Sequence, residues 1–342
     1  MEISFTPPIR LRTAIERWPL VSPVRITGKV FENMDVLVLS IEKDGRVGMG
    51  EACGLYYKND TPGRMAEQVE SIRSAFEMGF SRKSIQGMLP PGGARNALDC
   101  AVWDLEAKLT RRSAWLMAGL NIPQPLLTTL TCGADEPEKM ADRARHLYAQ
   151  GRAIKLKLTG EPVDADRVRA VREARPDVWL AVDANQGLNR ASFERLLPVL
   201  LDARVALMEQ PFPIGQDSLL DGLQCPIPIA ADESLQTLSD LPKITGRFQV
   251  ANIKLDKCGG VTEALAMVRA AREFGLDTMI GNMGGTSLSM APAFLVGQLC
   301  NVVDLDAPIF LKADRATAVQ YFGGFVTSPE SLWGSADPHA GF

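Results

Sequence analysis

Residues 153–183 read AIKLKLTGEPVDADRVRAVREARPDVWLAVD. The short apolar runs at the two ends of this stretch, 153–158 and 179–183, predict two strands, and the segment between them has the apolar spacing of a helix. A crossover helix between two such runs places the strands parallel and side by side in one sheet. The stretch therefore predicts an α/β protein built on a parallel sheet.

The same alternation continues through the chain from residue 128 onward. Short apolar runs predict eight strands, at 128–132, 153–158, 179–183, 205–209, 228–232, 250–255, 278–282 and 302–304. Stretches of helical period between them predict helices at 136–149, 164–174, 190–201, 235–244 and 261–274. Eight parallel strands with intervening helices close into a barrel, whose chemistry lies at the C-terminal ends of the strands. The last strand leaves little room for a full helix after it.

The first 120 residues have a different pattern. Alternating residues at 36–42 and a second run at 47–51 flank the turn Lys43-Asp44-Gly45, which predicts a β-hairpin. Helical spacing follows at 66–76 and 94–109. This part of the chain is therefore expected to form a separate α+β layer next to the barrel.

Composition excludes several classes of partner. The 342 residues carry 37 Lys and Arg against 41 Asp and Glu, and a net charge of −4 gives no field that would attract nucleic acid or an anionic membrane. The six cysteines form no C-x-x-C pair, which indicates a reducing cytoplasm. The first residues lack the apolar core of a secretory signal, and the uncharged stretch 278–303 is interrupted by polar residues, so a buried strand, loop and helix explain it better than a membrane span.

Carboxylates end three consecutive predicted strands. Asp183, Glu209 and Asp232 are 26 and 23 residues apart, one strand-helix unit each, so they reach the same rim of the barrel. A single such acid is more simply explained as a helix cap or an ion-pair partner, but three in register favour a metal site. Carboxylate oxygens suit Mg²⁺, with Mn²⁺ as the alternative, and such a site leaves positions for substrate oxygens.

Three lysines lie inside predicted strands that should otherwise be apolar. Lys155 and Lys157 are two residues apart and therefore point to the same face of their strand, while Lys254 lies on the strand half a ring away. A carbon atom held between them could be approached from both sides. Burial and like charge are expected to lower the pKa of these lysines towards neutrality, as proton abstraction requires.

Further polar residues follow the acids directly. Asn185, Gln210 and Glu233 are candidates for supporting the metal ligands, although loop or cap polarity explains them about equally well. The two histidines, His146 and His339, fall outside the strand ends, which disfavours a histidine base or a zinc site.

Taken together, these motifs resemble the enolase superfamily, and within it the muconate-lactonizing-enzyme subgroup, over essentially the whole chain. The motifs are Ile154-Lys155-Leu156-Lys157, Val182-Asp183-Ala184-Asn185, Met208-Glu209-Gln210-Pro211, Ala231-Asp232-Glu233-Ser234 and Asn252-Ile253-Lys254-Leu255-Asp256. The resemblance implies a modified (β/α)₇β barrel, TIM-like, at residues 121–317. It also implies an α+β capping domain at residues 1–120 that the C-terminal tail, from about 318 to 342, completes.

One motif narrows the resemblance to the dipeptide epimerases. Asp304-Leu305-Asp306 is similar to the Asp-x-Asp signature with which that family receives the α-ammonium group of its substrate. The resemblance implies that Mg²⁺ holds the terminal carboxylate of a dipeptide and stabilises an enediolate, while Lys157 and Lys254 exchange the α-proton on opposite faces. Asn282 and Thr286 are expected to contact the substrate backbone.

The preferred dipeptide stays open. An arginine that Ala-Glu-specific members carry in the first capping loop has no counterpart here, and Arg25 or Lys29 is the candidate replacement. The second capping loop, residues 53–60, also departs from the Ala-Glu pattern. Whether the chains assemble into a homo-oligomer is open as well.

Two other functions compete with dipeptide epimerisation. A cycloisomerase, or a dehydratase of the o-succinylbenzoate synthase type, would use the same lysines and metal on an acid without an ammonium group, which Asp304 and Asp306 would repel. A catalytically inactive barrel kept as a binding protein is the non-enzymatic alternative, and degraded motifs would favour it.

Overall fold

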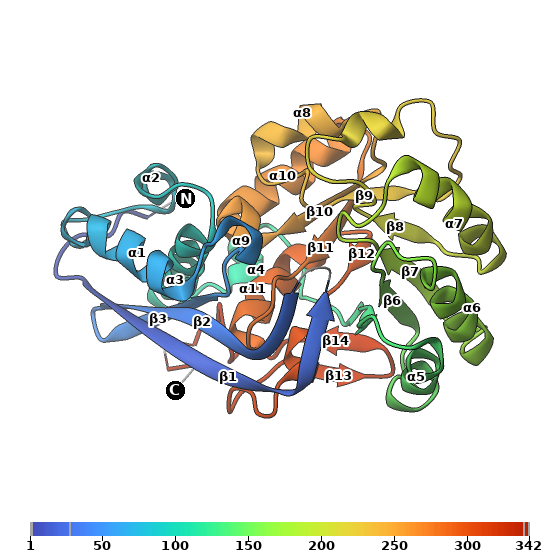
Figure 1. Cartoon of the computed structure of the whole chain (residues 1–342). Helices are drawn as coiled ribbons and strands as arrows, with labels where there is room; N and C mark the ends of the chain where they lie inside the picture. Colours follow the sequence, from blue (N-terminus) through green and yellow to red (C-terminus); the bar gives the residue numbers. More distant parts are fainter. Residues whose placement is uncertain (1–2, 27–28, 338, 341–342) are drawn as a thin grey trace.

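The computed structural model describes residues 3–26, 29–337 and 339–340, and the side chains of Arg25, Ile26 and Lys29 also lie outside the description. Two bodies lie side by side (Figure 1): a layer of three long strands with helices on one side, and a ring of short strands surrounded by helices. The second body contains the parallel sheet that the sequence predicts.

Eight parallel strands form the ring, and each pairs with its neighbour in chain order. They are β5 (Leu130–Cys132), β6 (Ala153–Lys157), β7 (Trp179–Asp183), β8 (Leu207–Glu209), β9 (Ile229–Ala231), β10 (Val250–Lys254), β11 (Asp277–Gly281) and β12 (Val302–Val303). The Thr129 amide donates to the Val303 carbonyl at 3.0 Å, which joins the last strand to the start of the first. The predicted TIM-like barrel is confirmed.

Alternation along the strands divides the barrel interior into two layers. Ala181, Leu207, Ala230, Val250 and Met279 form a separate apolar cluster inside the ring. Because side chains two residues apart share a face, the next inward positions are those of Asp183, Glu209, Asp232 and Asn252. An apolar plug therefore lies beneath a polar layer at the C-terminal ends of the strands.

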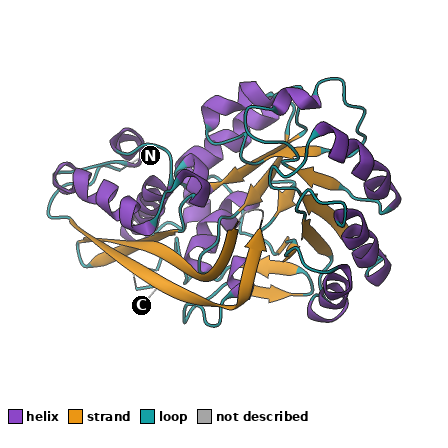
Figure 2. Cartoon of the chain, viewed as in Figure 1, coloured by secondary structure: helices purple, strands orange, loops and turns teal. Residues whose placement is uncertain are grey.

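Helices cover the outside of the ring (Figure 2). They are α5 (Pro137–Asp142), α6 (Asp164–Ala174), α7 (Arg190–Asp202), α8 (Leu241–Ile244), α9 (Leu255–Cys258), α10 (Val261–Glu273) and α11 (Ser287–Gly297). The predicted helix 136–149 is α5 continued by a π-helical turn, Arg143–Leu147. The only helical element after β12 in the described residues is a 3₁₀ turn, Ala307–Phe310, which agrees with the prediction that a full helix has little room there.

The predicted helix 235–244 is wrong over its first half. Two short pieces replace it, a 3₁₀ turn at Leu238–Asp240 and α8. The Asp240 carboxylate accepts the amides of Gln236 and Thr237, and these bonds favour a capped turn over a continuous helix.

The first body is an antiparallel sheet packed on helices. Its strands are β1 (Arg10–Ile26), β2 (Lys29–Lys43) and β3 (Arg46–Ala52), and its helices are α1 (Pro62–Glu77), α2 (Arg82–Met88), α3 (Gly93–Thr110) and α4 (Ala114–Met117). The predicted hairpin is β2 and β3, and the predicted helices are α1 and α3. The sequence did not predict β1, whose alternation is interrupted by Pro19 and Pro23.

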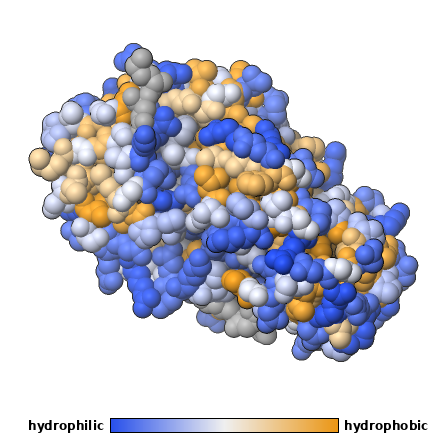
Figure 3. Space-filling view, turned by 90° about the horizontal axis from the view of Figure 1, so that it is seen from above, coloured by the Kyte–Doolittle hydropathy of each residue, from blue (hydrophilic) through white to orange (hydrophobic). Residues whose placement is uncertain are grey.

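The chain ends by returning to the first part of the molecule. Strand β13 (Gln320–Phe322) pairs with β14 (Phe325–Thr327), and β14 pairs in turn with β4 (Leu126–Leu127). Beyond them, the Trp333 indole donates to the Cys100 carbonyl on α3 at 3.1 Å. None of the helices in the described ranges is both long and apolar enough to cross a membrane. From above (Figure 3), hydrophilic side chains cover much of the surface, with smaller hydrophobic patches between them.

Candidate active site

A pocket lies at the C-terminal ends of the barrel strands and is bordered by the first two strands of the capping sheet. The barrel contributes polar side chains, among them Lys155, Lys157 and Lys254. Leu20, Val24 and Phe31 enter from β1 and β2. The two predicted bases therefore face one cavity from β6 and β10, four strands apart in the eight-stranded ring.

The three predicted metal ligands end adjacent strands, and all are buried. Asp183 lies opposite Glu209 in the register of β7 and β8, and Asp232 directly follows β9. Asp183 and Glu209 are wholly inaccessible to solvent, and Asp232 is 3% exposed. Three negative charges at this depth require cationic partners.

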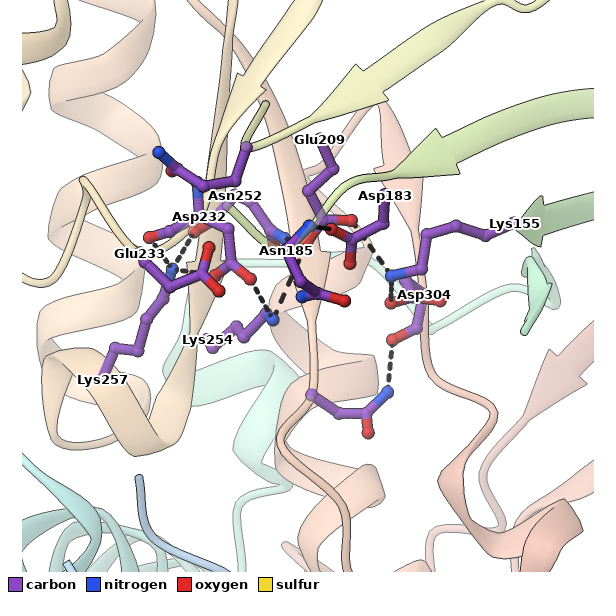
Figure 4. A network of polar contacts seen from close by, with 12 residues as sticks. Lys155, Asp183, Asn185, Glu209, Asp232, Glu233, Asn252, Lys254, Lys257 and Asp304 are labelled. Carbon is purple, nitrogen blue, oxygen red and sulfur yellow. Dashed lines mark hydrogen bonds and ion pairs between the residues drawn. The ribbon is translucent and has the colours of Figure 1, made fainter. Parts of the chain in front are cut away.

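Lysines supply those partners (Figure 4). Lys254 Nζ lies 2.6 Å from Asp232 Oδ2 and 3.8 Å from Glu209 Oε1. Lys155 contacts Glu209 at 3.1 Å and also pairs with Asp304, while Lys157 lies 2.5 Å from Asp183. Each of the three acids is thus bound to at least one of the three lysines.

These pairs reverse the expected direction of the lysine pKa. Burial alone would lower the pKa of Lys254, but the charges of Asp232 and Glu209 outweigh it and raise the pKa above its usual value. The pKa of Lys155 is also raised, because Asp304 and Glu209 outweigh its burial. The expectation of lowered lysine pKa values is therefore wrong for these two residues while the acids remain their partners.

The carboxylates respond in different ways. Burial, with the nearby charge of Asp183, raises the pKa of Glu209 to about 7 despite its two lysines. Burial also raises the pKa of Glu233 to about 8, with the charge of Asp232 adding to the shift. Asp232 is buried too, but Lys254 and Lys257 outweigh that effect and hold its pKa below the usual value.

The donor set fits a divalent cation in its chemistry, although the side chains are turned towards lysines. Within the described residues, no three His, Cys, Asp or Glu side chains lie close enough together to hold a metal ion as they stand. Beside the three carboxylates, however, Asn185 Oδ1 and Glu233 Oε2 are buried without a hydrogen-bond partner in the described part of the chain. Unsatisfied acceptor oxygens next to three acids suit a hard cation.

Backbone conformation after these strands is unusual. Asn185, Gln186 and Gln210 have φ values of 41°, 67° and 33°, in the left-handed region that residues with side chains rarely adopt. The Asn185 amide thereby reaches Asp183 Oδ1 at 2.8 Å, and Gln210 Oε1 accepts the Asp232 amide at 3.0 Å. Strained backbone of this kind clusters at functional sites, where it fixes the positions of the side chains.

Comparison with known proteins identifies the family. A family model described as "Enolase C-terminal domain-like" matches residues 139–327, and one described as "Mandelate racemase / muconate lactonizing enzyme, N-terminal domain" matches residues 8–119. The chain belongs to the enolase superfamily. Within this superfamily it is 36% identical to the L-Ala-D/L-Glu epimerase of Escherichia coli K12 over 310 residues, covering 90% of this chain and 96% of the relative.

Solved structures of the superfamily agree. A protein from Agrobacterium tumefaciens with homology to dipeptide epimerases, solved with sodium and L-Ala-L-Glu, has a TM-score of 0.92 and 36% identity, covering 96% of this chain and 100% of that one. The dipeptide epimerase of Methylococcus capsulatus, solved with Mg and L-Arg-D-Lys, has a TM-score of 0.86 and 28% identity, covering 94% and 96%.

The Asp-x-Asp pair of this enolase-superfamily chain lies at the pocket, and its two acids are held differently. Asp304 pairs with Lys155 and accepts the Thr129 hydroxyl, and although burial opposes it, Lys155 lowers its pKa. Asp306 accepts the Thr131 amide at 2.5 Å, and burial together with the charge of Asp304 raises its pKa to about 6. Both acids line the cavity.

The other predicted substrate contacts divide into three groups. Asn282 lines the pocket and donates to the Asp304 carbonyl at 2.7 Å. Thr286 does not line it, because its hydroxyl donates to Glu51 at 2.5 Å and it caps α11. Arg25 and Lys29 end β1 and begin β2, and their side chains lie outside the described residues.

Several residues of the site went unrecognised in the sequence. Asn252 donates to Glu209 at 2.8 Å, and Lys257 lies 2.6 Å from Asp232 Oδ1. Asn252 is two residues before Lys254, so strand alternation could have indicated that it points inward. Tyr56 and Tyr57, from the second capping loop, also line the pocket. Because they lie in a loop, no strand or helix periodicity in the sequence could have indicated their direction.

Proposed function

We propose that this protein epimerises dipeptides by Mg²⁺-dependent proton exchange at the α-carbon beside the terminal carboxylate, which makes it an isomerase. One observation carries the proposal: Lys157 and Lys254 face one pocket from strands half a ring apart, and the Asp304 and Asp306 pair lines the same pocket. Two opposed amines allow a proton to leave one face of a carbon and return on the other.

The roles of the lysines follow from their partners. In the unprotonated form, Lys157 or Lys254 takes the α-proton, and the opposite lysine, as an ammonium, delivers a proton to the other face. The electron pair left on carbon is delocalised into the carboxylate as an enediolate. Lys155 remains charged because its pKa is raised by two acids, and it therefore stabilises negative charge near the carboxylate instead of acting as a base.

Asp183, Glu209 and Asp232 are the proposed ligands of the metal, supported by Asn185, Gln210 and Glu233. Mg²⁺ held there would supply positive charge beside the substrate carboxylate and would offset the charges of Asp232 and Glu209 that raise the pKa of Lys254. Asp306, whose side chain carries no ion pair in the described part of the structure, would receive the substrate ammonium with Asp304.

The two alternatives fit the pocket less well. A substrate without an ammonium group would leave the buried Asp306, which has no ion pair in the described part of the structure, without a cationic partner. A purely binding role leaves unexplained why three lysines and three acids are held in one network at the strand ends.

We also propose a capping domain of residues 1–120 with about 318–342, a barrel of residues 121–317, and a cytoplasmic location. The tail supports the first division, since the Gly334 amide donates to Asp104 on α3 at 2.8 Å. All six cysteines, each within the described ranges, are free thiols, as expected in a reducing compartment.

Deuterium exchange tests the proposal. L,L-dipeptides incubated in D₂O with the protein and Mg²⁺ should gain deuterium at the α-carbon of the C-terminal residue, followed by NMR or mass spectrometry. Lys157→Met and Lys254→Met should each lose epimerisation by about 10³-fold and keep exchange with only one stereoisomer, a different one for each variant. Lys243→Met, at an exposed position, is the control. No exchange with any dipeptide would contradict the proposal.

A further inference from the structure

The pocket has an aromatic wall. Phe31 on β2 lies edge-to-face against Tyr56, with ring centroids 5.6 Å apart and planes at 81°. Tyr56 in turn lies edge-to-face against Tyr57, at 5.2 Å and 89°. Val24 and Met34 line the pocket beside them. This aromatic wall, defined as Phe31, Tyr56 and Tyr57, presents mainly apolar surface to whatever occupies the cavity.

Hydrogen bonds fix the aromatic wall to the barrel. The Gly54 amide donates to Asp256 Oδ1 at 2.8 Å, two residues beyond Lys254. Gly54 has φ of +78°, and an added Cβ would lie 2.0 Å from the Asp60 carbonyl, so the turn that carries the tyrosines requires glycine. Gln236 Nε2 donates both to the Tyr57 hydroxyl at 3.1 Å and to the Glu233 carbonyl at 2.9 Å.

The aromatic wall lies on the side of the pocket where Asp232, Glu233 and Lys254 are found. Tyr56 and Tyr57 lie close enough to Asp232, Glu233 and Lys254 to feel their charges. The opposite half, beside Asp306, is lined by Ala307, Phe310 and Leu20, and Leu20 bridges to Leu311. We consider a dipeptide whose carboxylate lies at the proposed metal ligands and whose ammonium group lies at Asp304 and Asp306. Its C-terminal side chain would then lie near the aromatic wall.

Charge in this half disfavours an acidic side chain. Of the residues that line the described pocket, the cations are Lys155, Lys157 and Lys254, and each is already paired with an acid. Because none of these three cations is free to pair with it, a further carboxylate would be buried without a counter-charge or would have to take up a proton, and both cost free energy. Burying an apolar side chain against the rings is favourable instead.

We infer that the residue epimerised by this protein carries an uncharged apolar side chain, aliphatic or aromatic, which is bound by Phe31, Tyr56 and Tyr57. The inference rests on the proposed function and names its substrate class. It departs from the L-Ala-L-Glu bound in the Agrobacterium tumefaciens structure and from the L-Arg-D-Lys bound in the Methylococcus capsulatus structure.

A matched substrate panel tests the inference on the unaltered protein. With Mg²⁺ in D₂O, kcat/KM for α-deuteration should be about 100-fold higher for L-Ala-L-Phe and L-Ala-L-Leu than for L-Ala-L-Glu and L-Ala-L-Lys. Fastest exchange with the Glu peptide would overturn the inference but leave the proposed function intact. Fastest exchange with the Lys peptide, whose ammonium group could pair with Glu233, would have the same meaning. Exchange with none of the four would overturn both.

Variants at the wall sharpen the result. Phe31→Arg should move the preference towards L-Ala-L-Glu by about tenfold or more, mainly through KM, while Phe31→Leu keeps the apolar peptides ahead. A Phe31→Arg protein that still favours L-Ala-L-Phe by the full wild-type ratio would contradict a role for Phe31. If wild-type exchange favoured L-Ala-L-Glu and fell in Arg25→Ala or Lys29→Ala, an acidic specificity would replace the inferred one.

Discussion

At the scale of single residues, strand alternation was enough to place the charged groups but not to pair them. Lys155, Lys157 and Lys254 occupy inward positions because neighbouring strand residues point the other way, and the sequence contains that pattern. Their partners come from residues 22 to 149 positions away in the chain. Since the pKa of a lysine depends on which acid it meets, the direction of the shift could not be predicted from strand position alone.

Asp256 gives a pH-dependent prediction at this scale. Burial raises its pKa to about 6, so the folded protein binds this proton more tightly than the unfolded chain does. Its contribution to stability is therefore complete below about pH 4 and is lost as the pH rises through about 6. Asp256→Asn can still accept the Gly54 amide but does not titrate.

Urea unfolding of wild type and Asp256→Asn from pH 4 to 7 measures the effect. The free energy of unfolding of the wild type should fall by about 2–3 kcal/mol more than that of the variant over this range. Asp99, whose pKa is also raised to about 6 by burial, titrates in both proteins and cancels in the comparison. Parallel curves for the two proteins would show that Asp256 does not carry this proton.

At the scale of elements, the barrel strands were predictable and the capping strand β1 was not. Each barrel strand is a short, mainly apolar run, and its type follows from that run alone. Strand β1 is exposed over much of its length, contains Pro19 and Pro23, and owes its extended form to pairing with β2. Such pairing is a contact between two segments, and the alternation of residues within one segment does not reveal it.

Close packing between β3 and α3 supplies a prediction for these elements. A Cβ on Gly50 would lie 2.1 Å from the Ala97 carbonyl oxygen and 2.7 Å from the Ala101 amide nitrogen, and helix backbone cannot give way. Gly50→Ala should lower the free energy of unfolding by about 2 kcal/mol or more. Gly63→Ala, in α1, meets no atom within 4 Å and should instead stabilise by up to about 1 kcal/mol. Thermal and urea unfolding of both variants measure the difference, and equal stabilities would refute the packing argument.

At the scale of the whole molecule, one arginine joins the capping sheet to the barrel. Arg315 lies 2.7 Å from Glu16 on β1 and 2.6 Å from Glu51 on β3, and its guanidinium also donates to Thr286 at the start of α11. Glu51 is wholly buried, and its pKa is raised by burial despite this partner. The sequence offers no sign of the pairing, because 264 positions separate Arg315 from Glu51.

Removing Arg315 should therefore weaken the attachment of the cap. Arg315→Met leaves Glu51 buried without its counter-charge and should cost about 3 kcal/mol in the free energy of unfolding. In the double variant Glu51→Gln/Arg315→Met, the loss should be smaller than the sum of the two single losses, since the pair acts as a unit. Additive losses in urea unfolding would mean that the two residues are not coupled.

Metal binding is the second prediction for the whole molecule. Mg²⁺ at about 100 times its Kd should raise the free energy of unfolding by about 2.7 kcal/mol, because it binds the folded chain. Asp183→Asn, which removes one proposed ligand, should abolish this gain while Glu194→Gln on the exposed side of α7 retains it. Thermal unfolding with Mg²⁺ or with EDTA measures the change, and an equal rise in all three proteins would point to binding elsewhere.

The lysines at the acid cluster have a consequence for metal uptake. Lys155, Lys254 and Lys257 pair with Glu209 and Asp232 and offset much of their negative charge. An ion bound by these acids would have to displace ammonium groups that belong to the same chain. We expect this competition within the chain to favour a readily exchanged ion over a permanently trapped one.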